Sequence, residues 1–187
     1  MPSHLHTVIT ESMQSWIAVG YQLFATEGPR GLKVEVIARK VEKSKSSFYH
    51  HFADLEVFTS FLLNEHLERA KIIAYRESQC ERVIPDLIDL LLDVKLDLFF
   101  NRQLRVNRNH RAYEDCLAKS NRLFESAMLD LWASELELEN KMTLANDLFK
   151  YAIENFYLQL TEENLTYEWL ENYFLDMKAM VKALKKS

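Results

Sequence analysis

The residues with the clearest chemistry lie together in the segment Ser44–Phe52, Ser-Lys-Ser-Ser-Phe-Tyr-His-His-Phe. Lys45 can donate to guanine O6 and N7, and the hydroxyls of Ser46 and Ser47 can pair with several bases. Donors and small side chains in the first turn of one short helix are what the DNA major groove admits. This trio therefore predicts contact with bases, and the alternative is an ordinary polar first turn.

The charge distribution supports this interpretation. Between Arg30 and Lys45 the chain has six basic residues and two acidic ones, although the whole protein has 23 Lys and Arg against 28 Asp and Glu, a net charge of −5. A concentrated basic patch is the electrostatic mark of a nucleic-acid partner. The acidic remainder would be repelled by phosphate, which favours one docking orientation.

Apolar residues recur at three- and four-residue steps along most of the 187-residue chain, which predicts an all-α fold. The three glycines end at Gly31 and the last proline is Pro85, so the later chain lacks the punctuation of β-hairpins. We expect a polar interruption at 101–110 and helices at about 7–26, 33–40, 45–51, 54–77, 85–98, 112–131, 143–160 and 167–185.

Two helices joined by a tight turn at Glu42-Lys43 hold the polar trio. Ser44 is a good N-cap for the second of them, because its hydroxyl can accept an orphan backbone N–H. Phe48 and Phe52, four residues apart, should face inward. We therefore predict a helix-turn-helix DNA-binding domain over 1–53 and a helical regulatory and dimerisation domain over 54–187.

The composition and motifs disfavour several other classes of protein. No apolar run reaches the roughly 18 residues that a membrane helix needs, and the first residues lack the features of a signal peptide. Cys80 and Cys116 are isolated, which supports neither a disulfide framework nor a zinc site. Catalytic and phosphate-binding motifs are missing. We expect a cytoplasmic protein that is no enzyme and needs no metal or cofactor.

The N-terminal quarter resembles the TetR family of bacterial transcriptional regulators over about residues 7–60. The resemblance rests on Leu23-Phe24-Ala25 before Gly28, on Ile37-Ala38, and on the segment Ser44–Phe52. It implies a sequence-variable helical body whose last two helices form a dimer, with an effector pocket between the middle helices.

The resemblance also implies further DNA contacts and reveals departures from the family pattern. Lys33 stands where a hydroxyl residue is usual and can still reach phosphate, while Glu42-Lys43 and Leu55 replace a glycine turn and a basic residue. A non-glycine residue in a left-handed turn costs on the order of 1 kcal/mol. The predicted DNA-binding residues are Lys33, Ser44, Lys45, Ser46, Ser47, Tyr49 and His50.

Aromatic residues of the middle helices could line the effector pocket that the resemblance implies, although such side chains can also be plain core. The candidates are Phe99, Phe100, Tyr113, Phe124, Trp132 and Phe156.

An apolar stripe along the last helix predicts a dimer interface, because two such helices per subunit can form a four-helix bundle across a twofold axis. Packing within the chain is the alternative. The predicted interface residues are Leu148, Tyr151, Leu170, Tyr173, Phe174, Met177, Val181 and Leu184.

Arginines recur every three residues at Arg102, Arg105, Arg108 and Arg111. In a helix they would lie along one side. A solvated face paired with acidic neighbours, an anion site and extra phosphate contacts all fit this pattern.

These features together predict a homodimeric one-component transcriptional regulator, a repressor that binds a pseudo-palindromic operator. An apolar or amphipathic effector in the middle helices would control its release. One alternative is a helical protein-interaction module with a degenerate DNA-binding head, which Glu42-Lys43 and Leu55 favour. A second is a helical enzyme with unrecognised catalytic groups in the middle of the chain.

Overall fold

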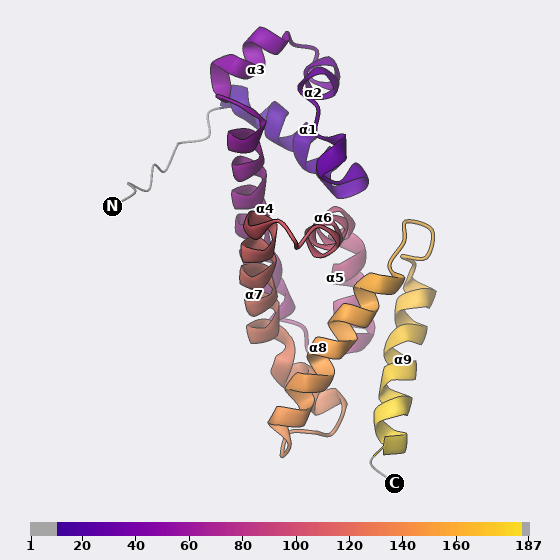
Figure 1. The fold of residues 1–187 in the computed structure, drawn as a ribbon. Coiled ribbons are helices and arrows are strands. Elements are labelled where there is room, and N and C mark those ends of the chain that lie inside the picture. Colours follow the sequence, from indigo (N-terminus) through magenta and orange to yellow (C-terminus); the bar gives the residue numbers. More distant parts are fainter. Residues whose placement is uncertain (1–10, 185–187) are drawn as a thin grey trace, which may run out of the picture.

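The computed structural model describes residues 11–184, and that part of the chain is built from helices joined by short turns (Figure 1). Its elements are α1 (Glu11–Glu27), η1 (Pro29–Gly31), α2 (Val34–Lys40), α3 (Lys45–His51), α4 (Leu55–Glu77), η2 (Val83–Leu87), α5 (Ile88–Asp93), α6 (Lys95–Val106), α7 (Arg111–Glu135), α8 (Met142–Gln159) and α9 (Tyr167–Leu184). The all-α fold predicted from the sequence is confirmed.

The helices form a small head and a longer body. Helices α1, α2 and α3 gather at one end, α4 and α7 run side by side as a column, and α8 and α9 lie at the other end (Figure 1). Helix α6 packs across α1, and α9 packs against α5. No helix of residues 11–184 is long and apolar enough to cross a membrane.

An aromatic cluster holds α3 against the rest of the head. Phe48, Phe52 and Phe58 are fully buried, as predicted for the first two, and the Phe52 and Phe58 rings lie 4.8 Å apart between centroids. Trp16 on α1 meets Phe48 edge-on at 5.6 Å. Burying large rings on the inner side of so short a helix leaves its polar side directed outward.

The turn between α2 and α3 is completed by backbone hydrogen bonds. Glu42 adopts the left-handed conformation with φ of 56°, as its place in the predicted turn requires. Its N–H donates to the Arg39 carbonyl at 3.2 Å, and the Lys43 N–H donates to the Ala38 carbonyl at 2.9 Å. These two bonds are the pattern that ends helices on a left-handed residue, so they offset the strain of a residue other than glycine.

Two side chains begin the next helices as the sequence predicts. The Ser44 hydroxyl accepts the Ser47 N–H at 3.1 Å, and the Asp54 carboxylate accepts the Val57 N–H at 2.8 Å. Each cap satisfies a backbone donor that has no partner within its helix. The starts of α3 and α4 are thereby fixed by side chains of the protein itself.

The buried core continues from the head into the body. Tyr21 and Phe24 of α1 lie against Phe100 of α6, each with ring centroids 4.3 Å away. Tyr113 of α7 meets Phe24 edge-on at 5.5 Å. A second cluster fills the space between α5, α7, α8 and α9. The core therefore does not divide at residue 53, because α4, α6 and α7 contribute to both ends.

One predicted helix is wrong. The sequence indicates a single helix from about Pro85 to Leu98, but the structure has η2, α5 and α6 there, with a break at Val94. Val94 is itself buried, so its apolar side chain keeps the helical pattern across the break. Periodicity alone cannot detect a backbone change that preserves the buried face.

Two helix boundaries also differ from the prediction. Helix α6 continues to Val106, so only residues 107–110 interrupt the pattern predicted at 101–110. Leu104 and Arg105 are buried there, and their packing extends the helix through polar sequence. The predicted start of the first helix near Thr7 lies outside the described residues.

Candidate functional site

Helix α3 presents most of the predicted DNA-contacting side chains on its outer surface. Lys45, Ser46 and His50 are exposed, and Tyr49 is 56% exposed. Ser47 is half-buried. Ser44 and Lys33 are exposed at the N-caps of α3 and α2, where the Ser44 hydroxyl is engaged by the cap. The surface combines cationic, hydroxyl and aromatic groups on a helix whose other side is fixed.

An ion pair that the sequence analysis missed lies on this surface. The Lys45 ammonium donates to the Glu35 carboxylate of α2 at 2.9 Å, and both side chains are exposed. The bond lowers the pKa of Glu35 and raises the pKa of Lys45. Exposed pairs of this kind contribute little to stability, so an anion of higher charge density can replace Glu35 as the partner of Lys45. The spacing of ten residues gives no local helical signal.

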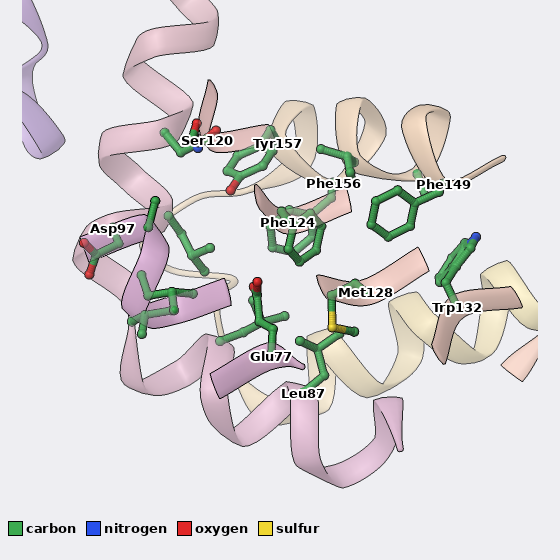
Figure 2. A pocket seen from close by; sticks show the side chains of 18 of the residues that line it. Glu77, Leu87, Asp97, Ser120, Phe124, Met128, Trp132, Phe149, Phe156 and Tyr157 are labelled. Atoms are coloured by element: carbon green, nitrogen blue, oxygen red, sulfur yellow. Dashed lines mark hydrogen bonds between the residues drawn. The ribbon is translucent and has the colours of Figure 1, made fainter. Parts of the chain in front are cut away.

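A second candidate site is a cavity of about 110 Å³ inside the body, bordered by α4, α5, α6, α7, α8 and α9 (Figure 2). This is several times the ~10–15 Å³ that one water molecule needs by the same measure. Phe124, Trp132 and Phe156, predicted as pocket residues, line it.

The other three predicted pocket residues lie elsewhere. Phe100 is fully buried and stacks on the rings of Tyr21 and His66, and Tyr113 packs on Phe24. Phe99 is partly buried between the two core clusters. Aromatic content marks the middle helices as core, but only the path of each helix decides which side chains border the cavity.

The cavity also has lining residues that the sequence analysis did not select as pocket residues. They include the aromatic residues Phe149, Tyr157 and Tyr173 and the polar residues His66, Glu77, Asp97, Asn101 and Ser120. Sequence offered no signal for the polar ones, because charged residues in an amphipathic helix are usually solvated.

Glu77 is the most unusual of these polar residues. It is the last residue of α4, is 4% exposed, and its carboxyl points into the space between the labelled rings (Figure 2). Among the described residues no hydrogen bond or ion pair to this carboxyl is found. Burial raises its pKa to about 8. The negative end of the helix dipole opposes ionisation in the same direction.

The opposite end of the cavity contains a connected polar network. Arg69 donates to both oxygens of Asp97, at 2.5 and 2.8 Å. The Tyr21 hydroxyl donates to Asp97 at 2.8 Å and lies 2.7 Å from His66 Nδ1. Because the hydroxyl has one hydrogen, it accepts from His66, whose Nδ1 is therefore protonated.

This network determines what His66 offers to the cavity. Burial lowers the pKa of His66 to about 4, so its ring is neutral at physiological pH. With the proton on Nδ1, Nε2 is an acceptor, and it has no partner among the described residues. The nearby Asn101 Oδ1 is also a buried acceptor without a partner, since its amide donates to Ser120 at 3.2 Å.

Comparison with known proteins identifies the head. Residues 17–56 match the sequence family described as "Bacterial regulatory proteins, tetR family". The match spans α2, the Glu42 turn and α3, together with most of α1 and the beginning of α4. The head of this chain is therefore similar to bacterial regulatory proteins of the tetR family.

Solved structures of TetR-family transcriptional regulators share its fold over nearly the whole length. One from Rhodococcus sp. has a TM-score of 0.58 and 17% identity, covering 92% of this chain and 97% of that one. One from Mesorhizobium loti MAFF303099 has a TM-score of 0.55 and 20% identity, covering 93% and 96%. No curated protein matches the chain significantly.

Several residues predicted for the dimer interface pack inside the subunit. Leu170, Tyr173 and Val181 are buried in the second core cluster, and Leu148, Phe174 and Met177 are partly buried against it. The Tyr173 hydroxyl donates to the Ala152 carbonyl at 2.7 Å. The side chain of Leu184 lies outside the described residues. The apolar stripe of α9 therefore serves mainly to attach that helix to its own body.

An exposed apolar stripe lies on α8. Leu144, Tyr151 and Leu158 follow one another at seven-residue intervals, and Tyr151 and Leu158 are 75% and 81% exposed. Residues seven apart share one helix face. On α9, Leu175 and Met180 are also about half exposed. Of the predicted interface residues, Tyr151 is exposed at the surface.

The four arginines do not form one face. Arg105 is buried, where it pairs with Glu154, donates to Asn121 at 2.9 Å and lies over the Tyr157 ring at 4.4 Å. It fastens α6 and α7 to α8. Arg108 is exposed and lies 3.6 Å from the same Glu154 carboxylate.

The remaining two arginines have different surroundings. Arg111 begins α7 beyond the break at 107–110, and its exposed side chain lies 3.9 Å from Asp115. Arg102 is half-buried, with an Nε that has no partner among the described residues. The acidic pairing weighed from the sequence thus applies to the exposed members, Arg108 and Arg111.

The raised pKa of Glu77 makes a prediction about stability. Between pH 4.5 and 8 the folded state retains a proton that the unfolded state releases, so Glu77 lowers stability as pH rises through this window. Glu77→Gln removes the ionisation. We expect the free energy of unfolding of this variant to exceed that of wild type by on the order of 3 kcal/mol near pH 7 and by little near pH 4.

Chemical denaturation across a pH series measures this difference in unfolding free energy. Glu68→Gln is the matched control, because Glu68 lies on the same helix but is exposed and pairs with Lys71. A Glu77→Gln effect that is independent of pH would contradict the assignment of a buried, unpaired carboxyl.

Proposed function

We propose that this chain is a TetR-family, homodimeric one-component repressor that binds a pseudo-palindromic DNA operator and releases it when a small molecule enters the cavity. The head, residues 1–53, would read DNA, and the body, residues 54–187, would dimerise and bind the effector. As a DNA-binding regulator of a bacterial family, it would act in the cytoplasm.

The observation that carries the DNA-binding proposal is the outward presentation of α3 by a rigid aromatic core. Lys45, Ser46 and Tyr49 are exposed while Phe48 and Phe52 are fully buried. In a helix-turn-helix protein the second helix enters the major groove with its first turns against base edges. Lys33 at the start of α2 would contact phosphate, which fixes the register without reading sequence.

Dimerisation is supported by the exposed stripe of α8. Leu144, Tyr151 and Leu158 offer a continuous apolar face that a twofold partner could cover with its own copy. Helix α9 also exposes Leu175 and Met180. We propose these residues as the interface, because Leu170, Tyr173 and Val181 are already used within the subunit. Two heads would then read half-sites about 34–36 Å apart or a multiple of that.

The packing of α6 on α1 would connect the cavity to the head. His66 and Asp97 line the cavity and also bond to Tyr21 of α1. An effector that favours a different position of α6 would therefore move α1 and change the separation of the two reading helices. It must bind the released state better by a few kcal/mol, since equal affinity shifts no equilibrium.

A protein-interaction module with a degenerate head is the competing function. The Glu42 turn gives this alternative little support, because both backbone hydrogen bonds of the turn form although Glu42 is not a glycine. Leu55 is partly buried against the head core, so it has a packing role in place of a phosphate contact. DNA binding separates the two functions.

The first test is binding to a duplex selected from a randomised library. We expect the affinity to fall steeply with salt concentration, because phosphate contacts release counterions. Lys33→Ala should weaken binding to all DNA sequences alike and reduce the slope of log K against log salt by about one. Fluorescence anisotropy measures both quantities.

Lys182→Ala is the control for this test, because Lys182 is exposed on α9 at the other end of the molecule. A salt-independent affinity, or equal slopes for Lys33→Ala and wild type, would count against the proposed docking face. Failure to select any duplex would favour the interaction module.

The second test concerns the interface. The double variant Tyr151→Glu with Leu158→Glu places charges on the exposed stripe of α8 and should convert dimers to monomers in light scattering. Ile72→Glu with Tyr75→Glu is the matched control, because both side chains are exposed apolar groups on α4. Dissociation by the control and not by the α8 variant would move the interface to α4.

A further inference from the structure

The cavity has an unusual combination of an apolar wall and one unpaired acid. Aromatic and aliphatic side chains of α5, α7, α8 and α9 form most of its surface (Figure 2). Its lining, as far as the described residues show, includes two carboxylates and no lysine or arginine. Asp97 is neutralised by the two bonds from Arg69. Glu77 has no such partner among the described residues, so a positively charged occupant would be needed to stabilise its ionised form.

The other unpaired groups at the cavity favour the same kind of occupant. His66 Nε2 and Asn101 Oδ1 are acceptors without partners among the described residues. The Tyr21 hydroxyl donates to Asp97 and the Ser120 hydroxyl donates to the Leu117 carbonyl, so neither hydroxyl hydrogen is free for them. The unpaired Trp132 Nε1 is a donor, but it points away from the cavity centre (Figure 2). The interior therefore offers acceptors and one carboxyl that a bound cation would keep ionised, which favours a ligand with donors and positive charge.

The positions of these groups along α4 give the ligand a direction. His66, Ala70, Ile73 and Glu77 all line the cavity and follow the three- and four-residue steps of one helix face. Eleven residues of helix span about 16 Å, so the acceptors near His66 and the Glu77 carboxyl lie at different ends. The rings of Phe124 and Phe156 border the space near Glu77.

We propose that the cavity binds a small organic amine in its protonated form, with its ammonium group on Glu77 and its apolar part among the aromatic rings. This inference rests on the proposed function, in which the same cavity holds the effector, and it names the chemical class of that effector. The ammonium donates to the carboxylate in a charge-assisted hydrogen bond and is also attracted by the faces of aromatic rings. Binding a cation supplies the partner that the protein itself does not provide to Glu77.

Three probes of similar size and different charge test the proposal on the full-length protein by calorimetry. They are 2-phenylethylammonium, neutral 2-phenylethanol and anionic 3-phenylpropionate. We expect the ammonium ion to bind tightest and the anion weakest. Glu77→Gln should lower the affinity for the ammonium ion by about tenfold or more, while the affinity for the neutral alcohol should change by less than about threefold.

Glu68→Gln, on the exposed side of α4, should leave all three affinities unchanged. Glu77→Asp, which keeps the charge, should retain part of the preference for the cation. Equal binding of the ammonium ion to wild type and Glu77→Gln overturns the proposal. So does tighter binding of the alcohol or the carboxylate, or no binding of the ammonium ion at millimolar concentration.

Failure of this inference is distinguishable from failure of the proposed function. Release of DNA by a neutral or anionic compound, without amine binding, would leave ligand-controlled DNA binding intact and overturn the amine. Amine binding that depends on Glu77 but does not alter DNA affinity would support the ligand class and contradict the regulatory role of the cavity.

Discussion

The buried polar network that joins α1, α4 and α6 is the interaction on which the rest of the structure depends. Asp97 is buried as a charge only because Arg69 and Tyr21 donate to it, and Tyr21 in turn accepts from His66. The Phe100 ring stacks on both Tyr21 and His66, at 4.3 and 4.5 Å between centroids. A buried charge that loses a partner is strongly unfavourable, so these three helices have one well-defined relative position.

This constraint explains how a short reading helix and a remote cavity can act together. Helix α3 is fixed by rings of α1 and α4, and α1 is fixed by the network to α4 and α6. His66 and Asp97 belong to the network and also line the cavity. A ligand that contacts His66 or Asp97 would act on side chains that are fixed by several hydrogen bonds. We therefore expect a small local change at these side chains to shift whole helices.

Local features of the fold could be predicted from the sequence, and long-range ones could not. Phe48, Phe52 and the Ser44 cap follow from spacing and residue type within one or two turns of helix. The break at Val94 keeps the apolar pattern and so leaves no trace in it. Tyr21 and Asp97 are 76 residues apart. Nothing near Glu77 marks it as buried, because a carboxyl at a helix end is usually solvated.

The coupling between head and body is tested most directly by hydrogen exchange in wild type and Tyr21→Phe. This substitution keeps the ring stack and removes one hydroxyl, which leaves His66 Nδ1 without its partner and Asp97 with Arg69 alone. The account predicts faster amide exchange in α1 and in α6 together, by about tenfold or more. Exchange that rises in α1 alone, or in neither helix, would contradict a network shared between the head and the body that contains the cavity.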